Sequence, residues 1–212
     1  MIPLDSITFL TATFNRHDFT IQMLKSLCSV MHYMPHVCIL DNSTQVAFPK
    51  IPNKYITVID NTNFKYTPNY NQPSKNHAAS LDWCIYNHIN TKYIVLCDND
   101  ILFKPQFIQL FSLSDNFHIL GDIGYDIIPP NRLYPYMCII DCDFMKSNDI
   151  RYFDNARCME NGLMDTGYSF LQDVIKFNAC IHQIHLYDYI IHLKGGTLHD
   201  KSLNALSQMQ MS

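Results

Sequence analysis

The sequence predicts a single α/β domain built on a mixed, mostly parallel central sheet that is flanked by helices. Short apolar and β-branched runs alternate with stretches whose apolar residues recur at helical spacing. Several of these runs end in Asp or Asn, which is typical of parallel strands whose carboxyl ends meet at one edge of a sheet. No repeat, low-complexity tract or linker interrupts the 212 residues, and this length fits one domain.

The composition limits the class of protein. Hydrophobic residues make up 48% and charged residues 16% of the chain, which excludes a disordered chain. The formal net charge is −4 and no basic block occurs, so we expect no nucleic-acid partner. We also expect no transmembrane segment and no signal peptide. The 8 cysteines form no C-x-x-C pair and mostly lie in apolar runs, which favours reduced core thiols and a cytoplasmic setting.

The first 60 residues predict three strands and one helix. The strands are expected at residues 6–12, 36–40 and 55–59. The second and third are each followed by an Asp-Asn pair. Between the first two strands, Asp18 is a candidate helix cap before apolar residues at helical spacing. This pattern predicts neighbouring strands with polar residues at their carboxyl ends.

The remaining elements are organised around residues 92–103, which read KYIVLCDNDILF. The apolar run 93–97 predicts a strand that is buried on both faces and ends at Asp98 and Asp100. Two carboxylates at the end of a buried strand are costly unless their charge is compensated, and a divalent cation such as Mg²⁺ or Mn²⁺ commonly does this. The alternative is a turn with a helix cap at Lys104. No glycine-rich phosphate loop occurs, so a metal at these carboxylates is the candidate phosphate anchor.

The segments on either side of this strand predict further helices and strands. Ser74 is expected to cap a helix before it, and Pro105 is expected to open a short helix after it. We expect irregular structure at residues 121–135 and 151–164. We further expect strands at 137–141, 180–186 and 189–193, a helix following 165–167, and a short C-terminal helix.

The order of these pieces resembles the GT-A fold, the Rossmann-like domain of nucleotide-sugar-dependent glycosyltransferases. Asp98-Asn99-Asp100 matches the D-x-D motif of that family in sequence and setting. The resemblance implies nucleotide binding by Asp98 and by residues at the first strand, the second strand and the helix before the motif. Those residues are Thr11, Thr13, Arg16, Asp41 and Asn76.

The resemblance extends to the second half of the chain. Asp165 resembles the acidic residue of the family's "E-D" position, although Met164 stands where the family has Glu. His192 looks like the late His that completes the metal site, and His199 is its rival. The resemblance thus implies a metal site made from Asp98, Asp100, His192 and His199. It covers nearly the whole chain, whose compactness resembles glycosyltransferase domains of large DNA viruses.

The resemblance implies a metal-dependent enzyme that transfers a sugar from a nucleotide sugar, with a UDP-sugar favoured, to a glycan, glycoprotein or other hydroxyl acceptor. The nucleotide-binding part is expected at about 1–103 and the acceptor side at about 104–212. Asp165 is the expected catalytic residue, either as a base or as a group that stabilises the sugar ring, and its alternative is a helix cap. Glu160 and Asp141 are the next candidates.

Two other functions stay open at this point. One is a non-enzymatic nucleotide- or sugar-binding module with a relict metal site. The other is a sugar nucleotidyltransferase, which would need a G-x-G-T-R loop after the first strand, where this chain has no glycine. Three aromatic residues are candidates for stacking on a sugar, namely Trp83, Tyr134 and Tyr136.

Overall fold

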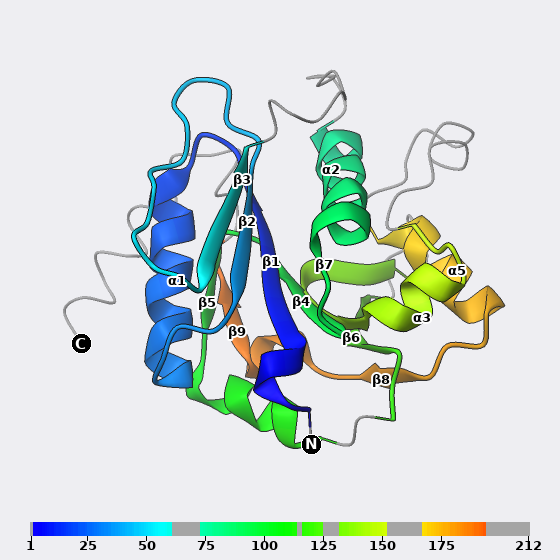
Figure 1. Cartoon of the computed structure of the whole chain (residues 1–212). Coiled ribbons are helices and arrows are strands. Elements are labelled where there is room, and N and C mark those ends of the chain that lie inside the picture. Colours follow the sequence, from blue (N-terminus) through cyan, green and yellow to red (C-terminus); the bar gives the residue numbers. More distant parts are fainter. Residues whose placement is uncertain (1, 61–72, 114–115, 125–131, 152–166, 194–212) are drawn as a thin grey trace.

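The computed structural model of the chain describes residues 2–60, 73–113, 116–124, 132–151 and 167–193. Within these residues the centre of the fold is a seven-stranded sheet with the order β3-β2-β1-β4-β7-β6-β8 (Figure 1). Its strands are β1 (Ile7–Thr13), β2 (Val37–Asp41), β3 (Ile56–Asp60), β4 (Tyr93–Cys97), β6 (Ile119–Gly124), β7 (Arg132–Asp141) and β8 (Ile181–Gln183).

The sheet is mixed and mostly parallel, as the sequence predicts. In the described part of the chain, β3, β2, β1 and β4 pair in parallel, as do β6 and β8. The strand β7 runs antiparallel to both of its neighbours, β4 and β6. The chain adds β2 and β3 on one side of β1 and then returns to place β4 on the other side. The order of strands therefore reverses between β1 and β4, and the carboxyl ends of such a pair form the usual ligand crevice of open α/β sheets.

Helices cover both faces of the sheet, so the central strands are apolar on both sides. Helix α1 (His17–Met31) lies on one face, and α2 (Pro73–His88), α3 (Cys142–Ser147) and α5 (Tyr168–Lys176) lie on the other (Figure 1). Phe9 of β1 packs into the core on the α1 side, and its neighbour Leu10 packs into the core on the α2 side. This burial on both faces explains why the strands read as continuous apolar runs.

A second, two-stranded sheet extends the fold beyond the end of β4. Its strands, β5 (Ile101–Phe103) and β9 (Ile190–His192), are antiparallel, and Ile101 lies opposite His192. Phe103 anchors this small sheet, because its ring contacts Phe9 at 6.1 Å and Phe107 at 4.6 Å. Three 3-10 helices complete the described elements, namely η1 (Leu4–Ser6), η3 (Pro105–Ser112) and η4 (Leu186–Asp188).

Several sequence predictions of helix starts need correction. The strand at 93–97 is confirmed to the residue as β4, and Pro105 opens a helix, which is of the 3-10 type. Asp18 is not a cap, because α1 begins at His17 and Asp18 lies in its first turn. Ser74 likewise lies inside the first turn of α2, which begins at Pro73. The helix α3 was not predicted.

The prediction of irregular structure at 121–135 is wrong for the residues that the structure describes there. β6 continues to Gly124, and β7 begins at Arg132 and runs through Pro135. Pro135 is accommodated because the pairing of β6 with β7 changes register between Gly121 and Ile123. A proline cannot donate to a regular ladder, but it is tolerated at such an irregularity.

All seven described cysteines are free thiols, and five of them are buried, whereas Cys28 is half-buried and Cys180 is exposed. None of the helices in the described ranges combines the length and the apolar character that crossing a membrane requires.

Candidate functional site

The two carboxylates of the D-x-D sequence lie at the carboxyl end of β4, where the strand order reverses between β1 and β4. Asp100 is 7% exposed, and Asn99 between the two aspartates is 5% exposed. The amide of Asn99 points the other way, toward α1, where it donates to the Thr20 hydroxyl at 3.4 Å. The turn therefore separates the polar side chains, with both aspartates available to one site and the asparagine bound to the helix.

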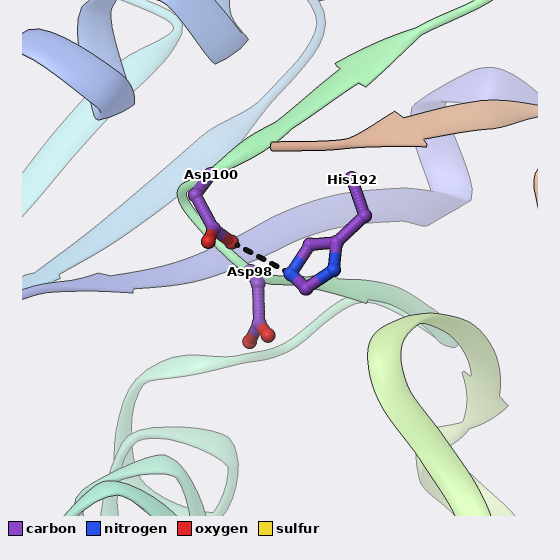
Figure 2. Close-up of side chains that lie close together, drawn as sticks. All are labelled: Asp98, Asp100 and His192. Carbon is purple, nitrogen blue, oxygen red and sulfur yellow. Dashed lines mark ion pairs between the residues drawn. The ribbon is translucent and has the colours of Figure 1, made fainter. Parts of the chain in front are cut away.

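His192 reaches the same place from the other end of the chain. The pairing of β9 with β5 continues past the strand ends, because the backbone N–H of Leu193 donates to the carbonyl of Asp100 at 2.8 Å. As a result, Nε2 of His192 lies 3.2 Å from Oδ1 of Asp100, and both side chains are about nine-tenths buried, with 11% and 10% exposed. Figure 2 shows the Asp100 carboxylate and the His192 imidazole facing one another, joined by the dashed line, with Asp98 just below them.

These three residues form what we call the Asp-Asp-His cluster (Asp98, Asp100 and His192). One ligand atom from each lies within 4.8 Å of the other two. Two carboxylate oxygens and one imidazole nitrogen form a donor set that suits a divalent cation. The buried carboxylate of Asp100 also needs a compensating charge. The residues present therefore fit a metal ion, and His199, the fourth predicted ligand, lies outside the described residues.

The structure adds a second histidine that the sequence did not assign to the site. Nε2 of His77 lies 3.8 Å from Oδ1 of Asp98. His77 follows Asn76, the predicted nucleotide-binding residue, near the start of α2. The sequence did contain one signal for His77. It lies at the start of the helix that precedes β4, and the start of that helix is close to the carboxyl ends of the strands.

Thr11 and Thr13 line the neighbouring end of β1. Both are buried, with 0% and 1% exposed. Neither hydroxyl oxygen has a hydrogen-bond partner among the residues that the structure describes. A buried hydroxyl without a partner costs about 1–3 kcal/mol, so such positions commonly hold a water or a ligand group. The predicted role of these two residues in nucleotide binding stays a prediction that this geometry supports.

Arg16 and Asp41 already have structural partners. The guanidinium of Arg16 donates twice to the carboxylate of Asp18, at 3.1 Å each, and lies 4.1 Å from the centre of the Phe19 ring. These hydrogen bonds lower the pKa of the Asp18 carboxyl. The buried carboxylate of Asp41 accepts from the backbone N–H groups of Ser43 at 3.0 Å and Phe48 at 2.6 Å. Asp41 therefore holds the loop that follows β2.

We expect Asp41→Ala to lower the free energy of unfolding by about 3 kcal/mol, because two hydrogen bonds to a buried charged acceptor are lost. The same change should weaken UDP binding with and without Mn²⁺, since the loop it holds borders the predicted nucleotide site. Calorimetry with UDP, together with a melting curve, measures both effects. If the loss of UDP affinity occurs only when Mn²⁺ is present, Asp41 acts on the metal and not on the nucleotide.

The predicted catalytic residue, Asp165, lies outside the described residues, as does Glu160. The structure does place the other alternative, Asp141. Asp141 pairs with Tyr93, at the opposite end of β4 from Asp98. The five-residue step from Tyr93 to Asp98 corresponds to about 16 Å of strand. The carboxylate of Asp141 caps α3 by accepting from the N–H groups of Asp143 and Phe144 at 2.9 and 3.0 Å. Asp141 is therefore a structural residue.

The cysteine next to the cluster is not a nucleophile. Burial raises the pKa of the Cys97 thiol, and the neighbouring Asp98 carboxylate raises it further. Cys97 therefore stays protonated, and a protonated thiol is a poor nucleophile and a poor metal ligand.

Beyond the cluster, a groove of about 440 Å³ borders His192 along β9, and Lys104 and Tyr187 complete its lining with Ile190 and Ile191.

Comparisons with known proteins find the fold and not a sequence family. No family model matches the chain, and no curated protein matches its sequence. The mannosyltransferase PcManGT from Pyrobaculum calidifontis, solved with GDP-Man and Mn²⁺, matches with a TM-score of 0.58 at 10% identity. That match covers 84% of this chain and 54% of PcManGT.

Two further structures give similar values. TarS from S. aureus in complex with UDP-GlcNAc matches with a TM-score of 0.52 at 12% identity, over 87% of this chain and 57% of that one. The galactosyltransferase LgtC, in complex with donor and acceptor sugar analogs, matches with a TM-score of 0.55 at 9% identity. That match covers 84% of this chain and 73% of LgtC. The chain thus spans little more than half of PcManGT and of TarS. The chain has the GT-A fold, which confirms the fold class that the sequence predicts.

Proposed function

We propose that this chain is a metal-dependent glycosyltransferase that moves a sugar from a nucleotide sugar to a hydroxyl acceptor. The observation that carries the proposal is the Asp-Asp-His cluster at the reversal point of a GT-A sheet. A UDP-sugar is the first choice of donor, and a glycan or glycoprotein is the first choice of acceptor. PcManGT was solved with GDP-Man and TarS with UDP-GlcNAc, so both nucleotides belong in the test.

Asp98, Asp100 and His192 would hold the metal. Mn²⁺ and Mg²⁺ both suit the carboxylates, and the imidazole nitrogen in the set favours Mn²⁺, since Mg²⁺ takes oxygen ligands. When bound, such an ion supplies positive charge that stabilises the departing nucleoside diphosphate.

The proposal gives roles to further residues as well. The hydroxyls of Thr11 and Thr13 would bond to the nucleotide, which would satisfy the two buried oxygens that have no partner in the described part of the chain. Asp165 would act on the acceptor hydroxyl as a base, or on the sugar ring as a stabilising carboxylate. Seven free cysteines support a reducing compartment such as the cytoplasm.

A donor screen tests the proposal. The protein is incubated with UDP-, GDP- and dTDP-sugars, with Mn²⁺, with Mg²⁺ or with EDTA, and release of the nucleoside diphosphate is measured. We expect release from one nucleotide class, with UDP-sugars first, and complete loss of release in EDTA. His192→Ala should lose this release, whereas its control His182→Ala should keep it, because His182 is an exposed histidine on β8, away from the cluster.

The outcomes separate the alternatives. Tight binding of a nucleoside diphosphate with Mn²⁺ but no release from any donor, with or without sugar acceptors, would identify a binding module with a relict metal site. Formation of pyrophosphate from a sugar phosphate and a nucleoside triphosphate would identify a nucleotidyltransferase. No binding of either metal or nucleotide would show that the proposal is wrong.

A further inference from the structure

Tyr136 of β7 contacts both strands that form the Asp-Asp-His cluster. Its backbone carbonyl accepts a hydrogen bond from the N–H of Asp98 at 3.0 Å, because β7 continues past the end of β4. Its ring stacks on the imidazole of His192, with ring centres 4.0 Å apart and planes at 24°. The same residue thus fixes the backbone of one predicted metal ligand and covers the side chain of another.

The stack continues along β7, away from the cluster. The ring of Tyr134 lies parallel to that of Tyr136, at 5.6 Å and 10°. The guanidinium of Arg132 lies 5.4 Å from the centre of the Tyr134 ring. Residues 132, 134 and 136 lie on one face of the strand because side chains alternate. Since these rings are stacked on each other and on His192, the structure favours a supporting role for Tyr134 and Tyr136 over the predicted stacking on a sugar.

The neighbouring strand leaves space for this stack. Gly124 of β6 pairs with Arg132, and a Cβ at Gly124 would lie 2.3 Å from the Tyr134 ring. No side chain fits there while Tyr134 keeps its position. Gly124 of β6 thus leaves the space beside β7 that the Tyr134 ring occupies.

We propose that Tyr136 is a positioning residue of the metal site, which holds the His192 imidazole so that Nε2 faces the carboxylates of Asp98 and Asp100. This inference rests on the proposed function in one respect, which is that the cluster binds a metal. β9 has only three residues, so its short ladder alone constrains the imidazole weakly. A ligand that is free to rotate must be ordered when the metal binds, and loss of groups that orient metal ligands typically costs 10–100-fold in affinity.

Mn²⁺ affinity, measured by electron paramagnetic resonance of free Mn²⁺ in the presence of UDP, tests the inference. We expect Tyr136→Leu to weaken Mn²⁺ binding about tenfold or more, and Tyr136→Phe, which keeps the ring, to stay within about twofold of the unmodified protein. Tyr136→Met, with a longer and more flexible side chain, replaces the Leu variant if circular dichroism shows that the Leu variant does not fold. Tyr86→Leu is the matched control.

Like Tyr136, Tyr86 is a half-buried tyrosine. Its ring lies 3.5 Å from the guanidinium of Arg151, and its hydroxyl donates to the carbonyls of Met145 and Ile150. Its loss should lower stability without changing Mn²⁺ affinity. A double-variant test then asks whether Tyr136 acts through the imidazole. In a His192→Ala background, Tyr136→Leu should cause no further loss of Mn²⁺ affinity.

Two results would overturn the inference while leaving the proposed function intact. One is Mn²⁺ binding by folded Tyr136→Leu or Tyr136→Met with unchanged affinity. The other is a loss of Mn²⁺ affinity on Tyr136→Leu that is as large in the His192→Ala background as in the protein that keeps His192. If the unmodified protein itself binds no Mn²⁺, both the metal-dependent function and the role of Tyr136 are wrong.

Discussion

Asp100→Asn is expected to lower donor turnover by roughly 10³-fold and to remove the Mn²⁺-dependent part of UDP binding. The amide has nearly the same shape as the carboxylate, so the turn after β4 should keep its structure. It carries no charge, however, and Asp100 lies closest to His192, at 3.2 Å, among the carboxylates of the cluster. A metal contributes several kcal/mol to charge stabilisation, and each 1.36 kcal/mol corresponds to a factor of ten in rate.

The measurement is turnover of the best donor together with calorimetry of UDP with and without Mn²⁺. Asp143→Asn is the control, because Asp143 is an exposed carboxylate in the first turn of α3, beside the structural cap Asp141. It should leave both quantities unchanged. A folded Asp100→Asn protein whose Mn²⁺-dependent UDP affinity stays within about twofold of the original would remove Asp100 from the metal site.

Asp165→Asn is expected to lower turnover by roughly 10²–10⁴-fold with little change in donor affinity. A general base or a ring-stabilising carboxylate acts in the transition state, so its loss affects kcat and not binding. The competing explanation is a helix cap, whose loss costs about 1 kcal/mol of stability and leaves activity intact. In the structure the capping position of α5 is occupied by Gly167, whose φ is 93°.

The test requires kcat, donor Kd and melting temperature from one preparation. Glu160→Gln is measured beside it, because Glu160 is the remaining carboxylate candidate once Asp141 is assigned to the cap of α3. Near-normal kcat in Asp165→Asn, with a loss in Glu160→Gln, would move the catalytic role to Glu160. A parallel drop in donor affinity and in kcat for Asp165→Asn would instead place Asp165 at the donor.

The sequence alone determined the elements whose signal is local. The run at 93–97 is apolar at every position because both faces of β4 pack into the core. The abrupt change to Asp98 marks the end of the strand. The same argument predicted β1 and β2 within about one residue. The two carboxylates of the cluster could be predicted because they follow a strong strand signal directly.

Only the tertiary structure decided which distant residues join those carboxylates. β5 and β9 have three residues each, which is too short for a periodic pattern, and their pairing joins segments almost ninety residues apart. That pairing places His192, one of two histidines that the sequence could not choose between, beside Asp100. Tyr136 reaches the cluster because β7 runs on past β4, through a proline that local rules read as an interruption. The physical reason is the same in both cases: short strands and irregular registers are stabilised by non-local hydrogen bonds and packing, which leave no period in the sequence.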